Sequence, residues 1–120
     1  MNIQKRRAVA YIAGRLISGT PSGAVYDYAT AAHYKIYGDV SPDYIQVYDE
    51  DRYGYIRGNA TPAGLSLFDH PTRQNIRMRI SGDDFYGFDD ESSSYFSGEA
   101  SKSSVSLFDY QAGKNYRYAI

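Results

Sequence analysis

An aspartate that directly follows an aromatic residue recurs along this chain at a nearly constant spacing. Successive copies are 22, 20, 20 and 20 residues apart, and each closes a short stretch of alternating apolar residues. These repeat aspartates are Asp27, Asp49, Asp69, Asp89 and Asp109. A fixed period repeated this often marks one supersecondary unit that is copied along the chain. The repeat therefore constrains the architecture more strongly than any other feature of the sequence.

The residues before each aspartate predict a β-strand. Positions two and four before it are mostly apolar, as at Leu65 and Leu67. The position between them is small or polar in four of the five units, with Tyr86 as the exception. Such alternation is typical of a strand that buries one face. Because an aspartate side chain can bond the backbone two residues on, it favours the start of a turn, and we expect each strand to end there.

A second strand is predicted after each turn. Apolar residues recur seven, nine and eleven positions after the aspartate, as at Ile76, Met78 and Ile80. In two units a glycine, Gly58 or Gly98, takes the ninth position. These glycines either allow a curved sheet to bend or bulge, or lie in ordinary turns. Each unit is therefore predicted to be a β-hairpin.

Five hairpins give about ten strands joined by short connections. Sequential neighbours should then pair as an antiparallel meander. An open sheet of this size would leave two edges exposed, so the sequence favours a meander that is closed or rolled into a barrel. A β-sandwich and a β-trefoil are the alternatives. The fold class predicted is all-β, with residues 1–120 forming one domain and the hairpin repeats occupying residues 20–120.

Residues 1–19 precede the repeats and carry a helical pattern. Apolar residues follow the spacing of a helix at Val9, Ile12, Ala13 and Leu16. Asn2 is a candidate N-cap, and Gly19 is a candidate stop. A strand is the alternative, because residues 11–14 resemble residues 55–58 and 95–98. We expect a short amphipathic helix that presses its apolar stripe onto the barrel mouth or an exposed core edge.

The same segment is only superficially similar to a secretory signal. Lys5, Arg6 and Arg7 precede an apolar run, but Arg15 interrupts it after about seven residues, the minimum for such a signal. We therefore expect the segment to be retained, which favours a cytoplasmic location. No stretch approaches the ~20 apolar residues of a membrane-spanning helix.

Composition excludes several classes of function. The chain has no cysteine, which excludes disulfides, thiolate catalysis and cysteine-bound zinc. Its formal net charge of −1 gives no general attraction to nucleic acids or anionic membranes. Tyrosine is abundant, with 14 copies, and it suits both half-buried sheets and binding surfaces.

Period-two geometry predicts which side chains face outward. The residues eight positions after the aspartates are Lys35, Arg57, Arg77, Ser97 and Arg117. The aromatic residues directly before the aspartates share that outer face, and they are Tyr26, Tyr48, Phe68, Phe88 and Phe108. We call the four cations and five rings the surface ladder. It could bind a glycan or a polyanion, but mutual pairing of rings and cations across strands is the simpler interpretation.

No constellation of residues indicates catalysis or metal binding. His33 and His70 lie beside turns of different units, without a nucleophile pattern near either. Acidic residues cluster at positions 49–51 and 83–91, where the spacing matches no calcium loop and suits solvated turns. We therefore predict no catalytic residue, no metal site and no cofactor.

The function expected from these patterns is a non-catalytic binding, interaction or structural module. Its partner would be a protein that contacts the tyrosine- and arginine-rich outer face, or a second copy that pairs with an edge strand such as residues 115–120. The alternative is a small-ligand carrier or an enzyme that uses the barrel interior, which would require a cavity of a few hundred Å³.

Overall fold

Ten strands surround one helix in the computed structural model, which describes all residues from Met1 to Ile120. The helix α1 spans Ile3–Ser18. The strands are β1 (Ala24–Asp27), β2 (Ala32–Val40), β3 (Tyr44–Asp49), β4 (Gly54–Thr61), β5 (Gly64–Asp69), β6 (Gln74–Ser81), β7 (Asp84–Asp89), β8 (Ser94–Ser101), β9 (Ser104–Asp109) and β10 (Lys114–Ala119). The five predicted hairpins are therefore all present.

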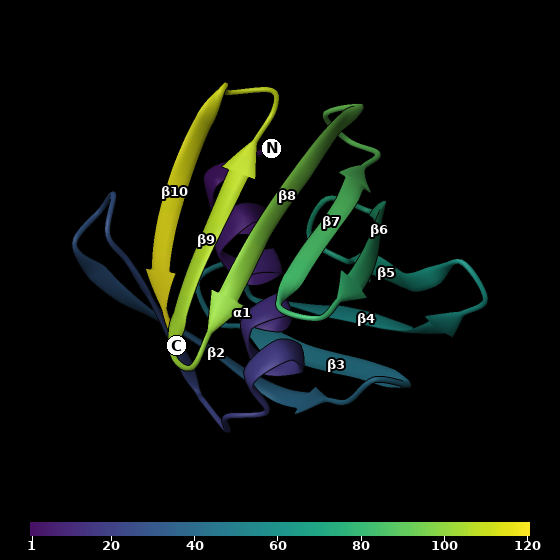
Figure 1. Ribbon diagram of the computed structural model, residues 1–120, viewed down its shortest axis with the longest axis horizontal. Coiled ribbons are helices and arrows are strands. Elements are labelled where there is room, and N and C mark those ends of the chain that lie inside the picture. Colours follow the sequence, from purple (N-terminus) through teal and green to yellow (C-terminus); the bar gives the residue numbers. More distant parts are fainter.

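The strands form a closed antiparallel barrel (Figure 1). Each strand pairs with its neighbours along the chain, and β1 pairs with β10 to close the ring. The predicted meander and barrel are thus confirmed. β10 pairs with β9 along its length and with β1 through Tyr118 and Ala119. This differs from the free edge expected at residues 115–120, because ring closure gives the last strand a second partner.

Each odd-numbered strand ends at a repeat aspartate, as the sequence predicts. The aspartate side chain also begins the turn that follows. The carboxylate of Asp27 accepts a hydrogen bond from the backbone N–H of Ala29 at 2.9 Å, and that of Asp109 accepts one from Gln111 at 3.0 Å. The repeat aspartates therefore set the position of the hairpin turns at one end of the barrel.

Gly58 and Gly98 lie inside β4 and β8, so the interpretation that they occupy turns is wrong. A Cβ atom at Gly98 would collide with the carbonyl oxygen of Ser106 on β9 and would lie 2.5 Å from the ring of Phe85. Neighbouring strands therefore approach too closely at this point for any side chain. The glycines mark positions where the curved sheet crowds its own backbone.

α1 runs inside the ring of strands (Figure 1). All residues from Lys5 to Gly14 are buried, and the helix packs mainly against β8, β9, β1, β2 and β10. The predicted caps are confirmed, since the Asn2 side chain accepts from the backbone of Lys5 and Gly19 adopts a left-handed φ of 68°. α1 is not a helix that is long and apolar enough to cross a membrane.

The expectation that α1 would press one apolar stripe onto the barrel mouth or an exposed core edge is wrong, because the helix is buried on every side from Lys5 to Gly14. A barrel of this strand number encloses more space than strand side chains alone can fill. Small residues keep the helix narrow at Ala8, Ala10, Ala13 and Gly14. A Cβ atom at Gly14 would lie 2.7 Å from a methyl group of Val105. The helix is therefore the centre of the hydrophobic core.

Candidate functional site

The five repeat aspartates point into the barrel at the end where α1 begins. All five are buried, with 2% exposure or less. They share the inward face with the apolar residues two and four positions before them, such as Leu65 and Leu67. We call this set the aspartate ring. The interpretation of the acidic cluster residues as solvated turns is therefore wrong for Asp49 and Asp89, which period two turns inward.

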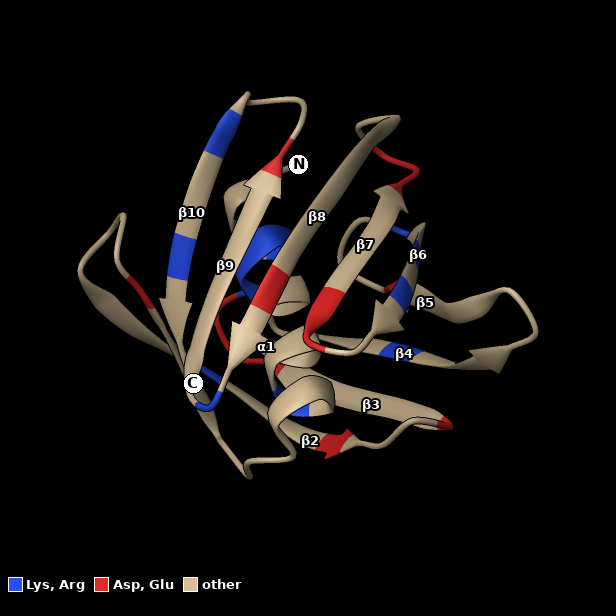
Figure 2. Ribbon diagram, viewed as in Figure 1, with Lys and Arg blue, Asp and Glu red and all other residues tan.

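Four basic side chains, each 7% exposed or less, pair with the aspartate ring. Figure 2 shows the basic segment of α1 inside the barrel. Three come from consecutive residues of α1, in the pairs Lys5–Asp89 (2.9 Å), Arg6–Asp109 (3.1 Å) and Arg7–Asp27 (2.9 Å). The fourth, Arg52, bridges Asp49 at 2.7 Å and Asp69 at 2.8 Å. The basic residues that resemble a signal sequence thus form the ionic contacts between helix and barrel.

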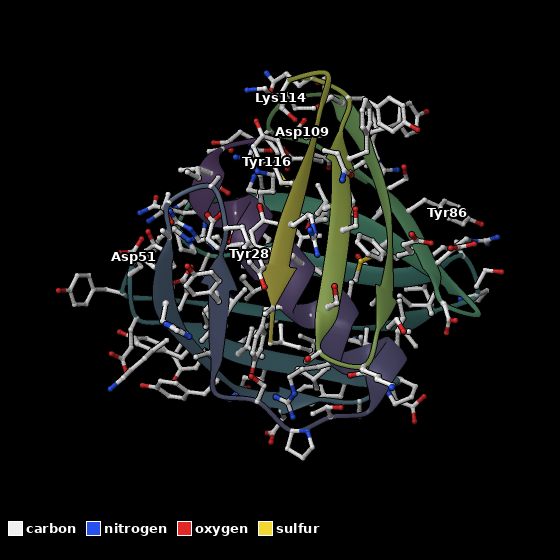
Figure 3. All side chains as sticks on the ribbon, turned by 60° about the vertical axis from the view of Figure 1, so that its left-hand side comes forward. Tyr28, Asp51, Tyr86, Asp109, Lys114 and Tyr116 are labelled. Carbon is white, nitrogen blue, oxygen red and sulfur yellow. The ribbon has the colours of Figure 1, made fainter.

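Aromatic rings complete these contacts. The guanidinium of Arg6 lies 3.4 Å from the ring centroid of Tyr116, and that of Arg7 lies 3.5 Å from Tyr34. Figure 3 shows Tyr116 close to Asp109 at this end of the barrel. Every buried side-chain nitrogen and oxygen in the structure has a hydrogen-bond partner. The aspartate ring is therefore fully used by the fold and leaves no group free for a ligand.

Folding shifts the pKa values of two aspartates of the ring, Asp49 and Asp89, in opposite directions. Burial raises the pKa of Asp49 and outweighs the contacts from Arg52 that favour its ionised form. Burial also disfavours ionised Asp89, but hydrogen bonds from Lys5 and Ser92, with the charge of Lys5, outweigh it and lower the pKa. The ionised form of Asp89 is therefore favoured by the cation that α1 supplies at Lys5.

The surface ladder points outward, and most of its members contact a neighbouring ring on the outer face. The four cations are exposed, while the five rings are half-buried. Arg57 lies 4.6 Å from the ring of Tyr55, and Arg77 lies 5.4 Å from that of Phe88. Rings also meet edge-on across hairpins, as Tyr48 does with Tyr55. This pairing supports the simpler interpretation, in which most of the ladder covers the sheet.

The two histidines pack separately against ladder rings. His33 lies 4.7 Å from the Tyr26 ring, and His70 lies 4.8 Å from the Phe68 ring. Neither forms an ion pair or shares a carboxylate with the other. The structure also holds no cluster of three or more histidine, aspartate or glutamate side chains arranged for a metal ion.

A groove of about 300 Å³ crosses the outer face of β6, β7 and β8. Its charged residues are Arg77 and Arg79, and its rings are Tyr86, Phe88 and Tyr95. Tyr95 is 66% exposed, and Arg79 donates to the carbonyl oxygen of Ala63 at 2.8 Å. The lining itself contains no carboxylate, although Arg77 pairs with Asp90 beside it at 2.9 Å. We call it the basic groove.

A second groove, of about 400 Å³, lies beside the first on β7 to β10. Its residues are mostly polar or aromatic, and they are Asp84, Phe85, Tyr86, Ser97, Gly98, Glu99, Ser106, Phe108 and Asn115. The lining contains two carboxylates and no cation, so we call it the acidic groove. Tyr86 belongs to both grooves and stands on the outer side of the barrel (Figure 3).

Strand register explains why the acidic groove forms where it does. Tyr86 on β7 lies opposite Ser97 on β8, and Ser97 lies opposite Phe108 on β9. A small side chain thus sits between two rings. Ser97 takes the place that a cation occupies in the other four units, and Tyr86 takes a place that is small or polar in the others. The two departures from the repeat are therefore direct neighbours.

Among the sequence-predicted site residues, the structure brings Arg77 and Phe88 into the basic groove and Phe108 into the acidic groove. The other ladder members lie outside both. The sequence prediction missed Tyr86, Ser97 and the carboxylates of the acidic groove. Comparison of the chain with protein-family models, with curated proteins and with solved structures finds no match.

Proposed function

We propose that this protein is a non-catalytic binding module, and that its site is the outer face of β6 to β10. The observation that carries the proposal is the pair of adjoining grooves of opposite charge that share Tyr86. This side chain is 46% exposed, so a large ring is available to a partner at the centre of the site. Partly exposed tyrosines supply much contact area at low entropic cost.

The charge pattern favours a peptide segment of another protein as the partner. Nucleic acids and most charged glycans carry a single sign of charge, which complements only the basic groove. A polypeptide can present both signs within a few residues. Serine, asparagine and tyrosine side chains in the grooves also resemble the composition of adaptable protein-binding surfaces. We infer an extended segment with an acidic and a basic residue, laid across the strands.

The alternative function, a small-ligand carrier, has less support. The buried helix α1 occupies the barrel centre, and its core side chains such as Tyr11 and Ile12 are inaccessible. One observation favours it: a mostly apolar pocket of about 200 Å³, lined in part by Leu16, Leu65 and Ile80, lies where α1 ends. That pocket is smaller than a typical ligand site.

Titration of the isotope-labelled protein with short peptides, followed by ¹⁵N–¹H correlation spectra, tests the proposal. The probe is an extended tetrapeptide with glutamate and lysine at its ends, and the reference is the same peptide with two glutamines. We expect the charged peptide to shift the amide signals of β6 to β9, with an affinity on the order of millimolar.

A matched pair of variants localises the effect. Tyr86→Ala should weaken binding several-fold, whereas Tyr44→Ala, which truncates a ring of almost equal exposure (45%) on β3, should leave it unchanged. Equal effects of the two variants, or binding of a sulfated oligosaccharide in place of the peptide, would contradict the proposed function.

A further inference from the structure

The acidic groove holds two carboxylates that the fold does not neutralise. Asp84 on β7 and Glu99 on β8 are exposed and lie directly opposite each other (Figure 2). Neither takes part in any of the ion pairs of the structure. Like charges in directly opposite positions destabilise a sheet. The protein therefore keeps an unfavourable pair at this site, and a bound cation would relieve it.

The rings of the groove add to the attraction for a cation. Tyr86 and Phe108 flank Ser97 in one cross-strand row, and two strand spacings separate them by roughly 10 Å. The faces of aromatic rings attract cations. Because Ser97 is small, the groove between the rings stays open, and the Ser97 hydroxyl contacts only the hydroxyl of Tyr110, at 3.3 Å. In the other units this position carries Lys35, Arg57, Arg77 or Arg117, so the groove lacks a cation at the very place where the repeat would supply one.

We propose that the acidic groove binds a primary ammonium group, as carried by a lysine side chain of the partner peptide. The inference rests on the proposed function and adds the chemical identity of the group bound. An ammonium donates three hydrogen bonds, which the carboxylates of Asp84 and Glu99 and the hydroxyl of Ser97 can accept. Two carboxylates are too few oxygen ligands for a calcium ion, which requires six to eight. The acidic residue of the same peptide then faces the basic groove.

The test uses a small probe that carries only this group. Nα-acetyl-lysine N-methylamide presents the ammonium on a neutral backbone, and the norleucine analogue has the same aliphatic chain without the charge. We expect the lysine probe to shift amide signals around Tyr86, Ser97 and Glu99 in a saturable way, and the norleucine analogue to bind at least tenfold more weakly. Added salt should weaken the lysine probe, because the contacts are exposed.

Two sets of variants distinguish binding by the acidic groove from an effect of the protein's overall charge. Asp84→Asn with Glu99→Gln should reduce affinity for the lysine probe at least tenfold. Asp39→Asn with Asp43→Asn changes net charge by the same two units at exposed positions, one on β2 and one in the β2–β3 connection, and should leave affinity unchanged. Ser97→Arg restores the cation of the repeat, and should abolish binding by filling the space between the rings.

Several results would overturn the inference. These are equal binding of the norleucine analogue, an equal loss in the Asp39/Asp43 variant, unchanged binding in Ser97→Arg, or no signal shift with the lysine probe. If the lysine probe fails while the glutamate–lysine peptide still shifts signals of the basic groove, only this inference fails. If the peptide fails as well, the proposed function fails with it.

Discussion

Carboxylates are paired with cations in the aspartate ring inside the barrel. They are unpaired in the acidic groove on its outer face. Inside, five aspartates are buried, and each has a cation within 3.1 Å. Outside, Asp84 and Glu99 are exposed, adjacent and without an ion-pair partner. A buried charge must be paired to be tolerated, whereas an exposed one can stay unpaired at small cost. The interior charges therefore stabilise the fold through their ion pairs, whereas the outer carboxylates are available to bind a partner.

The largest effect is expected at Lys5, whose ammonium is fully buried between Asp89 and Glu91. Lys5→Met leaves Asp89 without its cation, and removing one partner of a buried pair costs about 3–5 kcal/mol. Chemical denaturation measures this loss. Lys35→Met, at an exposed ladder position, is the control and should change stability by less than about 0.5 kcal/mol. Adding Asp89→Asn to Lys5→Met should recover part of the loss; equal stability of both single variants would contradict the role of the ring.

A smaller loss is expected from Gly98→Ala. The added methyl group would collide with the Ser106 carbonyl, and overpacking of this kind costs about 1–3 kcal/mol. Gly23→Ala is the matched control, because nothing lies within 4 Å of a Cβ atom at that position. The midpoint of thermal unfolding should fall for Gly98→Ala alone. An unchanged midpoint would mean that β8 and β9 do not approach as closely as the structure shows.

The pH dependence of stability separates Asp89 from Asp49. The pKa of Asp89 is lowered by folding, so its contribution is complete above its unfolded value of about 3.8 and is lost as the pH falls below it. Asp89→Asn should therefore flatten the decline in unfolding free energy between about pH 5 and pH 2. The pKa of Asp49 is raised, so acid relieves the cost of its burial, and Asp49→Asn should make the decline steeper. Identical pH profiles of the two variants would refute this assignment.

The smallest effect is expected on the surface ladder. Replacing Arg57, Arg77 and Arg117 together by glutamine removes exposed cations, and each such change is worth less than about 0.5 kcal/mol. Circular dichroism and thermal unfolding should thus be nearly unchanged. A marked loss of stability would show that the contacts of these cations with surface rings support the barrel.

Much of the fold could be predicted because the repeat is a local signal. Apolar alternation, as around Leu65 and Leu67, predicts a strand, and an aspartate predicts its end. The sequence favours a closed barrel over a sandwich but does not decide between them, because closure depends on the long-range register between β1 and β10. The sequence does not predict the location of α1, although Ala8, Ala10 and Gly14 place small residues on more than one side of the helix and so permit close packing there.

The sequence also contains the signals from which the aspartate ring could have been predicted. The aspartates have the same parity as the inward apolar residues, and Lys5, Arg6 and Arg7 supply adjacent cations in a segment already predicted to pack on the barrel. The grooves were harder to predict, because they depend on register between strands. Their signal was the two breaks in the repeat, Tyr86 and Ser97, whose proximity only the pairing of β7 with β8 reveals.

The central claim is that the inner carboxylates stabilise the fold and the outer carboxylates do not. Comparing the unfolding free energies of two variants tests it most directly. The variant Asp84→Asn with Glu99→Gln removes two outer carboxylates, and Asp89→Asn removes one inner carboxylate. We predict that the outer double variant is at least as stable as the parent protein, because a like-charge repulsion is relieved. Asp89→Asn should be clearly less stable than the parent at neutral pH. An outer variant that loses as much stability as Asp89→Asn would contradict the account.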